Sequence, residues 1–304
     1  MSKPLVFTRR SQLTEFVQNT KARGDHIGLV PTMGALHEGH ATLIRRSVSE
    51  NSVTIATIFV NPKQFGPSED FGRYPRPLAD DLALLESCKA TAVFAPSIQE
   101  MYPEGFKTSV RVPDLSDVMC GSFRQGHFDG VCTVVLLLLN LASAHKAYFG
   151  LKDFQQFFIM RRMCLDLAHP TELIPVATVR ESDGLAMSSR NRYLNPEARQ
   201  KASAIPQALA QAAKLFLNGE RKAEIIVSKA VQVLSAEKLQ PQYLDLRDLE
   251  ALQTVVGEIQ NEAVLALAQP MSVPNGSCRL IDNIVLSTNP FYRGILEDLI
   301  ARTT

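Results

Sequence analysis

The chain has 304 residues, 45% of them hydrophobic, which suffices for one large domain or two ordinary ones. Its 32 basic and 31 acidic residues leave a net charge of +1, so no general basic field indicates a nucleic-acid partner. The longest charge-free apolar stretch, 131–144, is too short to cross a bilayer, and the N-terminus "MSKPLVFTRR" lacks the apolar core of a signal peptide.

The first part of the chain alternates buried strands with segments of helical spacing. Strands are predicted at 26–30, 53–60, 91–96 and 146–150, and helices at 37–50, 77–89, 130–142 and 153–167. This alternation predicts βαβ units and a parallel sheet covered on both faces. Residues 108–112 are predicted to form an extra strand outside that core. We therefore expect an α/β domain, a Rossmann-like doubly wound parallel sheet, over residues 1–178.

The character of the sequence changes at about residue 179, after which a smaller α+β domain is predicted over 179–304. A polar segment, "RESDGLAMSSRNRYLNPEAR", opens this domain. The elements expected after it are helices at 203–217 and 220–236, strands at 242–247, 262–268 and 278–286, a turn at "PNGS", and an amphipathic helix in the tail from 289.

Two histidines stand at the start of a predicted helix, directly after the first predicted strand, in "PTMGALHEGH". His37 and His40 are three residues apart and share one helix face. The free N–H groups and the positive dipole end of the helix favour an anion there, so the pair is suited to phosphate. Two alternatives are that the histidines cap or pack the first turn, or that they bind zinc. The zinc alternative lacks both a third ligand and the H-E-x-x-H spacing.

Three further polar clusters follow strand ends or the domain junction. Asn61 and Gln64 are neutral hydrogen-bonding groups suited to a hydroxylated or amide-forming substrate, and ordinary turn chemistry is the alternative. Lys152 follows a strand end where its ammonium group could reach phosphate oxygens, and a solvated Lys-Asp pair is the alternative. Met187–Arg190 could close over a triphosphate, and a polar linker is the alternative.

These clusters match the sequence motifs of one family. The sequence resembles the pantoate–β-alanine ligases, or pantothenate synthetases. The matching pieces occur in the family's order over about residues 1–286: "PTMGALHEGH", "FVNPKQFG" with "RYPR", "GHFDGVCTVV", "FGLKDFQQF", "RESDGLAMSSRNRYL" and "RLIDNIVL". The family belongs to the nucleotidyltransferase superfamily, in which an H-x-x-H-like element and a KMSKS-like loop surround ATP. Here "HEGH" and "MSSR" stand in those places.

The resemblance implies an ATP-dependent ligase with a two-step reaction. The carboxylate of pantoate attacks the α-phosphate of ATP, giving pantoyl adenylate and pyrophosphate, and the amine of β-alanine then displaces AMP to give pantothenate. A related nucleotidyltransferase that adenylates another acid, or a non-catalytic nucleotide-binding protein, are the alternatives. The neutral Gln64 and Gln156 favour a hydroxy-acid pocket over a nucleotidyltransferase for another acid. The presence of His40, Lys152 and the MSSR loop favours an enzyme over a non-catalytic protein.

The resemblance also implies the site residues. His37, His40, Lys152 and Arg190 would carry the phosphate chemistry, with His40 treated as a proton donor, and Asp81 would help to hold Mg²⁺. Asn61, Gln64 and Gln156 would bind pantoate or β-alanine. Residues expected to contact ATP are Met33, Gly34, Ala35, Leu36, His37, Glu38, Gly39, His40, Gly150, Leu151, Lys152, Asp153, Val179, Met187, Ser188, Ser189 and Arg190.

Three positions depart from the family's usual pattern. Gln125 replaces a proline, Leu137 a commonly basic residue and Leu151 a glutamate, and Leu151 stands beside Lys152. The residues after 286 exceed the usual family end. The family implies a homodimer acting on small molecules, with neither a nucleic acid nor a membrane as partner. The 5 cysteines lack C-x-x-C spacing, which favours reduced thiols and a cytoplasmic location.

Overall fold

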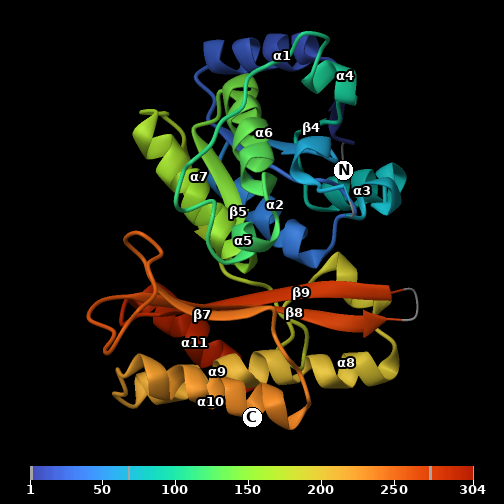
Figure 1. The fold of residues 1–304 in the computed structure, drawn as a ribbon. Coiled ribbons are helices and arrows are strands. Elements are labelled where there is room, and N and C mark those ends of the chain that lie inside the picture. Colours follow the sequence, from blue (N-terminus) through green and yellow to red (C-terminus); the bar gives the residue numbers. More distant parts are fainter. Residues whose placement is uncertain (1–2, 68, 274–275, 304) are drawn as a thin grey trace. The chain divides into compact units, whose positions relative to one another are not determined.

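The computed structural model describes residues 3–67, 69–273 and 276–303. Two compact units follow one another along the chain, Met1–Val176 and Ala177–Thr304 (Figure 1). Each unit has its own sheet and its own helices. No helix in the described part of the chain is long and apolar enough to span a membrane.

The first unit is built on a parallel sheet with the strand order β1-β4-β3-β2-β5-β6. Its strands are β1 (Leu5–Phe7), β2 (Ile27–Val30), β3 (Val53–Thr57), β4 (Ala92–Phe94), β5 (Lys146–Gly150) and β6 (Glu172–Val176). Strands β2, β3 and β4 are buried along their whole length, which explains their mostly apolar sequences. The chain order reverses between β2 and β5, and this is the switch point of a doubly wound sheet.

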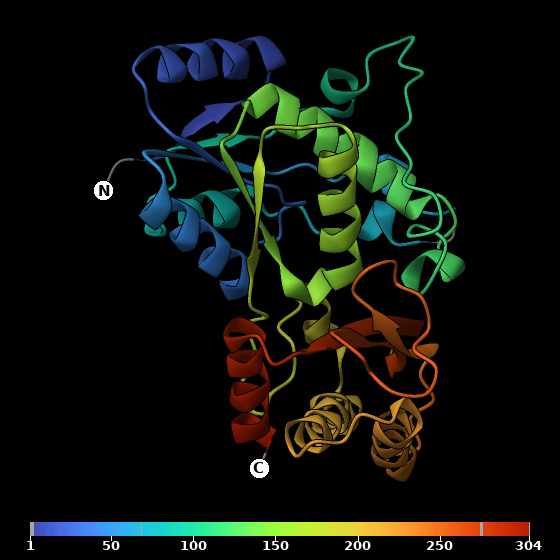
Figure 2. The same cartoon turned by 90° about the vertical axis from the view of Figure 1, so that its left-hand side faces the viewer.

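Helices cover both faces of this sheet, and Figure 2 shows α2 and α3 on one side with α6 and α7 on the other. The helices of the first unit are α1 (Arg10–Ala22), α2 (Glu38–Glu50), α3 (Leu78–Ser87), α4 (Ile98–Met101), α5 (Cys120–Phe123), α6 (His127–Ala142) and α7 (Phe154–Asp166). Short 3-10 turns follow β3 and β5: η1 (Pro62–Gln64), η2 (Phe71–Arg73) and η3 (Leu151–Asp153). The predicted α/β class is confirmed.

The sequence-based prediction of the first unit fails at its margins. The strand expected at 108–112 is wrong, because this segment is irregular and its Val110 N–H donates to Thr133 Oγ1 of α6 at 2.9 Å instead of to a strand. The prediction also missed β1, α1 and β6. Strand β1 has three residues, and β6 contains Pro175 and an exposed Glu172, so neither carries a strong strand pattern.

The second unit packs a three-stranded antiparallel sheet, ordered β7-β8-β9, against helices, as the predicted α+β domain requires (Figure 1). Its elements are η4 (Ser189–Tyr193), α8 (Pro196–Ala202), α9 (Ala204–Leu217), α10 (Ala223–Ala236), β7 (Tyr243–Asp248), β8 (Ala263–Val273), β9 (Gly276–Leu286) and α11 (Pro290–Thr303). The turn expected at "PNGS" falls on residues 274–275, which lie outside the described residues, and on the start of β9.

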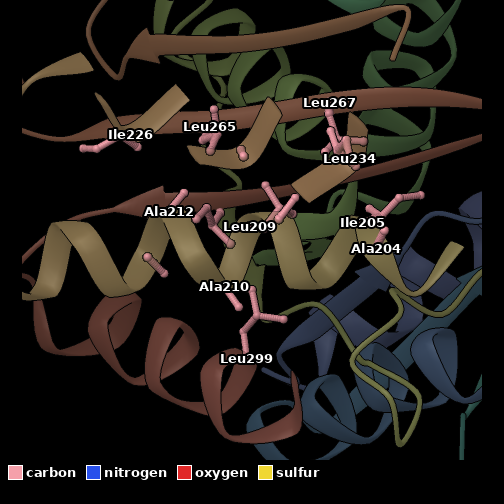
Figure 3. Packing of buried hydrophobic residues seen from close by; sticks show 14 of the residues in the cluster. Ala204, Ile205, Leu209, Ala210, Ala212, Ile226, Leu234, Leu265, Leu267 and Leu299 are labelled. Atoms are coloured by element: carbon pink, nitrogen blue, oxygen red, sulfur yellow. The ribbon is translucent and has the colours of Figure 1, made fainter. Parts of the chain in front are cut away.

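The core of the second unit is filled by small residues of α9 facing large ones from its neighbours. Figure 3 shows Ala204, Ala210 and Ala212 of α9 among leucines of β8, α10 and α11. Alanine lets a helix approach its neighbours closely, so Leu265 of β8 and Leu299 of α11 are both fully buried.

Candidate active site

The switch point places two chain segments at the same edge of the first unit's sheet. Strand β2 leads into the loop before α2, and the neighbouring β5 leads into η3 and α7. In open α/β sheets, ligands bind in the crevice beyond the carboxyl ends of the strands at this point. His37 and His40 follow β2, and Lys152 follows β5. The topology therefore brings the side chains predicted to bind phosphate to this edge of the sheet.

A buried carboxylate of α3 fixes the backbone conformation of the loop between β2 and α2. Asp81 is 1% exposed, and its two oxygens accept the N–H groups of Ala35 at 3.0 Å and Leu36 at 2.7 Å. Ala35 has a positive φ of 51°, which is strained for an alanine and persists because these bonds fix the backbone. Thr32 Oγ1 accepts the Gly34 N–H at 3.1 Å and completes the loop.

His37 and His40 cap α2 with their rings, which explains their spacing of three residues. His37 Nδ1 accepts the Gly39 N–H at 3.1 Å, and His40 Nδ1 accepts the His37 N–H at 3.3 Å. A side chain on Gly39 would lie 2.9 Å from the His37 ring, so this glycine lets the ring fold back. The predicted capping alternative is therefore real, and it serves the phosphate hypothesis because it fixes both rings 4.2 Å apart.

The capping bonds also fix the protons of the two rings. A backbone N–H can only donate, so each Nδ1 is an acceptor and each neutral imidazole carries its proton on Nε2. Burial, together with the neighbouring His37 and Lys152, lowers the pKa of His40 from 6.5 to about 3. At neutral pH His40 is therefore an uncharged donor through Nε2–H, with its ring oriented by the backbone.

Lys152 lies in η3, where its side chain is 22% exposed and its Nζ is 4.0 Å from Asp153 Oδ2. Its charge is felt at His40, so these two predicted residues share one electrostatic environment. Leu151, a departure from the family pattern, turns inward and is 4% exposed. The leucine therefore anchors η3 in the core and leaves Lys152 as the positively charged residue of this turn.

Asn61 and Gln64 form a single unit beyond β3. Asn61 Nδ2 donates to Gln64 Oε1 at 3.0 Å and to the Gly130 carbonyl at 3.1 Å, and its Oδ1 accepts the Tyr102 hydroxyl at 2.8 Å. Gln64 Nε2 contacts Met33 Sδ at 3.1 Å, which joins this unit to the loop after β2. Asn61 is 1% exposed, so the geometry supports a role in orienting Gln64, and direct contact of Asn61 with substrate stays a prediction.

Residues that the sequence analysis left without a role hold the same segment from the side of α6. His127 Nδ1 bonds the Gln64 carbonyl at 2.8 Å, and Arg124 contacts His127 Nε2 at 2.9 Å. Arg124 also pairs with Glu69 at 2.6 Å. Burial, with the Arg124 charge beside it, lowers the pKa of His127 to about 4. The quoted "GHFDG" motif was the signal for His127, and "MYPEG" contains Tyr102 without any recognisable pattern.

The two adjacent glutamines of α7 have different environments. Gln155 is 5% exposed, and its amide bonds the Cys120 N–H at 3.0 Å and the Val118 carbonyl at 2.8 Å. It therefore ties α5 to α7. Gln156, the predicted substrate residue, is half-buried on the next helix position. Among the other departures, Gln125 is exposed and Leu137 is half-buried.

The remaining predicted ATP residues belong to the second unit, where they form one connected segment. The Met187 N–H donates to the Val179 carbonyl at 2.9 Å, and Ser188 Oγ accepts the Arg190 N–H at 3.2 Å as the cap of η4. This segment is supported by a buried ion pair, in which Arg180 Nη1 lies 2.7 Å from Asp282 Oδ2 of β9. The structure thus brings Val179 and Met187–Arg190 together within one unit.

The described residues offer little to a magnesium ion on their own. They contain no group of three or more histidine, cysteine or acidic side chains that could hold a metal. Both oxygens of Asp81 already accept backbone N–H groups, so its role as a magnesium ligand stays a prediction. Magnesium often binds through substrate phosphates with few protein ligands, and such a mode needs no protein cage.

Comparison with known proteins decides the family. The family model for pantoate-beta-alanine ligase matches residues 5–285. The chain belongs to this family. It is 47% identical over 276 residues to the pantothenate synthetase of Thermotoga petrophila, covering 90% of this chain and 97% of the relative. It is 49% identical over 273 residues to that of Roseiflexus castenholzii, covering 90% and 96%.

Solved structures of the pantoate-beta-alanine ligase family share the fold. A pantothenate synthetase from Thermus thermophilus matches with a TM-score of 0.86 at 40% identity, covering 93% of this chain and 99% of that chain. A pantoate-beta-alanine ligase from Francisella tularensis, complexed with beta-gamma ATP and beta-alanine, matches with a TM-score of 0.72 at 29% identity, covering 94% and 99%. The family and the ligase class predicted from the motifs are confirmed.

Proposed function

We propose that this ligase condenses pantoate with β-alanine to form pantothenate, using ATP and passing through a pantoyl adenylate. Membership of the pantoate-beta-alanine ligase family over residues 5–285 supports the reaction. The observation that carries the mechanism is the pair of histidine rings capping α2 beyond β2, with Lys152 beyond the neighbouring β5. The ligase from Francisella tularensis, solved with an ATP compound and beta-alanine, supports the choice of co-substrates.

In the first step a carboxylate oxygen of pantoate attacks the α-phosphorus of ATP. The bond from this phosphorus to the oxygen bridging the β-phosphorus breaks, and pyrophosphate leaves. Such in-line transfer needs positioning and neutralisation of negative charge, with little covalent help from the protein. Lys152 provides a positive charge, and His37 and His40 provide Nε2–H donors whose directions are set by the capping bonds.

The low pKa of His40 changes the role that the resemblance gives it. A ring with a pKa of about 3 carries no extra proton to donate at neutral pH in the free protein. We therefore assign to His40 the stabilisation of charge on the phosphates by a hydrogen bond, in place of proton donation. The His37 N–H that donates to His40 Nδ1 favours the neutral ring, and a positive charge on His40 beside Lys152 would be unfavourable.

In the second step the β-alanine nitrogen attacks the acyl carbon of the adenylate. The bond from this carbon to the AMP oxygen breaks, AMP leaves, and the nitrogen loses a proton to water as the amide forms. Gln64 and Gln156 are proposed to bind pantoate through its hydroxyl and carboxylate groups, with Gln64 also near the incoming amine. Gln64 is suited to this because Asn61 and His127 fix its amide and its backbone.

Met187–Arg190 of the second unit is proposed to bind the ATP phosphates, with Val179 contributing from the paired backbone. Its support is the resemblance of "MSSR" to the family's loop and the buried ion pair of Arg180 with Asp282 beside this segment. In this proposal residues 1–178 form the catalytic domain, and residues 179–304 carry a loop that closes on the nucleotide. Magnesium, when bound with ATP, would neutralise phosphate charge.

The cellular setting is also a proposal. The 5 cysteines of the chain are all free and buried, which fits the reducing cytoplasm. A homodimer is expected from the family, and size-exclusion chromatography with light scattering measures it directly.

The test of the proposed function is pyrophosphate release from ATP and magnesium, with and without pantoate. Pantoate-dependent release before β-alanine is added, followed by AMP and pantothenate after it is added, is the expected result. A panel of other hydroxy acids serves as the control for substrate identity. Folded protein that binds ATP and releases pyrophosphate with another acid, but not with pantoate, would refute the proposal.

A further inference from the structure

The segment Met187–Arg190, which is proposed to bind ATP, continues directly from a short hairpin. Backbone bonds join the two arms of this hairpin, from the Met187 N–H to the Val179 carbonyl and from the Glu181 N–H to the Leu185 carbonyl, both at 2.9 Å. Met187 is at once the last residue of the outgoing arm and the first of the segment Met187–Arg190. A displacement of the hairpin therefore displaces this segment.

Charged groups fix the turn of the hairpin and tie it to η4. Arg199 of α8 places one guanidinium nitrogen 2.6 Å from Asp183 Oδ2 and the other 2.7 Å from Glu181 Oε2. Asn191 of η4 donates to Glu181 Oε1 at 2.6 Å. The turn and the 3-10 helix that begins at Ser189 thus form one connected body.

The far side of this turn is covered by α11. Gly184 has a φ of +87°, and a Cβ built there would lie 2.8 Å from Thr303 Cγ2, 3.2 Å from Pro206 Cβ and 3.7 Å from Leu299 Cδ1. The glycine is required twice, once for its backbone angle and once because α11 and α9 leave no room for a side chain. Leu185, the next residue, lies in the same buried cluster as Leu299.

Helix α11 lies beyond residues 5–285, which are the residues that the family model matches. It is nevertheless a packed part of the second unit, since Leu296 and Leu299 are both 0% exposed. Figure 3 shows Leu299 directed toward α9, whose Pro206 also touches the turn. Helix α11, which follows the residues matched by the family model, therefore packs against the hairpin turn at Gly184 that leads into Met187–Arg190.

We infer that α11 is a brace for the ATP loop, and that Leu299 and Thr303 are positioning residues that hold the Asp183–Gly184 turn in place. Contact across the turn limits the motion of the hairpin, and through it the motion of Met187–Arg190. The effect on ATP rests on the proposed function of this segment, whereas the mechanical brace does not. We expect loosening of the brace to weaken ATP binding without weakening pantoate binding.

Two leucines of α11 provide a matched comparison. Leu299→Ala removes a side chain that abuts Gly184, whereas Leu296→Ala removes an equally buried one that supplies none of the three atoms nearest to a Cβ at Gly184. Both create a cavity in the same helix and should lower the melting temperature alike. A milder variant, Thr303→Ser, removes the methyl group over Gly184 and keeps the hydroxyl that donates to the Leu299 carbonyl at 2.9 Å.

Tryptic cleavage after Arg190 and Arg192 measures the mobility of the loop, and steady-state kinetics measures its effect on catalysis. All assays run at a temperature where thermal denaturation shows each variant to be folded. We expect Leu299→Ala to be cut several-fold faster than Leu296→Ala without ATP, and to raise KM for ATP about three- to tenfold with KM for pantoate unchanged. Thr303→Ser should shift both quantities in the same direction by less.

Equal cutting of Leu299→Ala and Leu296→Ala would overturn the brace, whereas faster cutting with a change in kcat alone would refute its effect on ATP binding. If Leu299→Ala does not fold, unchanged cutting of Thr303→Ser would overturn it instead. The proposed function is judged separately, on the wild-type protein, by whether ATP slows cleavage after Arg190. Faster cutting of Leu299→Ala together with no ATP protection of the wild type would support the brace and refute the ATP role of the segment.

Discussion

His40 is predicted to act as a neutral hydrogen-bond donor, and a pair of substitutions can test this. Glutamine places an amide nitrogen close to the position of Nε2, whereas alanine removes the donor altogether. A hydrogen bond to a charged group contributes about 1.5–3 kcal/mol, which corresponds to about 10- to 150-fold in rate. We therefore expect His40→Ala to lose about 10- to 150-fold in kcat/KM for pantoate-dependent pyrophosphate release, and His40→Gln to recover most of that loss.

The control for this experiment is a histidine whose Nδ1 also accepts a backbone N–H, but at the opposite ends of the strands. His145 Nδ1 accepts the Ile27 N–H at 3.0 Å before β5, so His145→Gln loses a comparable bond away from the site. Pyrophosphate release by His145→Gln should match the wild type once folding is verified by circular dichroism. If His40→Gln is as inactive as His40→Ala while both remain folded, the neutral-donor reasoning is refuted.

Three further predictions concern buried charge. Asp81→Asn should destabilise the fold by about 1–3 kcal/mol in urea denaturation, because an amide cannot accept both loop N–H groups; the magnesium concentration for half-maximal activity should stay unchanged, and a large increase would instead make Asp81 a metal ligand. Burial lowers the pKa of His40 to about 3 and of His127 to about 4, below the ordinary 6.5, so the unfolded chain binds more protons and stability should fall as pH drops below about 6.5. The slope should reach about 1.4 kcal/mol per pH unit for each ring, and urea midpoints that stay constant from pH 7 to pH 5 would contradict it. Removing one partner of the Arg180–Asp282 pair, by Asp282→Asn, should cost about 3–5 kcal/mol of unfolding free energy, and a loss below about 1 kcal/mol would show that the pair does not support the loop base.

Some of the site could be read from the sequence because its groups lie within short motifs. His37 and His40 are three residues apart, and Lys152 follows a strand end, so local spacing and the doubly wound pattern together place them at one edge of a sheet. The motif order identified the family for the same reason. The roles of Tyr102 and His127 could not be read in this way, because their contacts with Asn61 and Gln64 join residues that are far apart in the chain.

By itself the sequence determined the family, the alternation of strands and helices, and the residue types available to bind phosphates. These depend on motifs and on local periodicity, which a single chain carries in its order of residues. The tertiary structure decided the protonation of His40, the bonds of Asp81 and the contact of α11 with Gly184. Burial, the direction of a backbone N–H and the approach of a distant helix are properties of the folded chain, because they arise where segments remote in sequence come together.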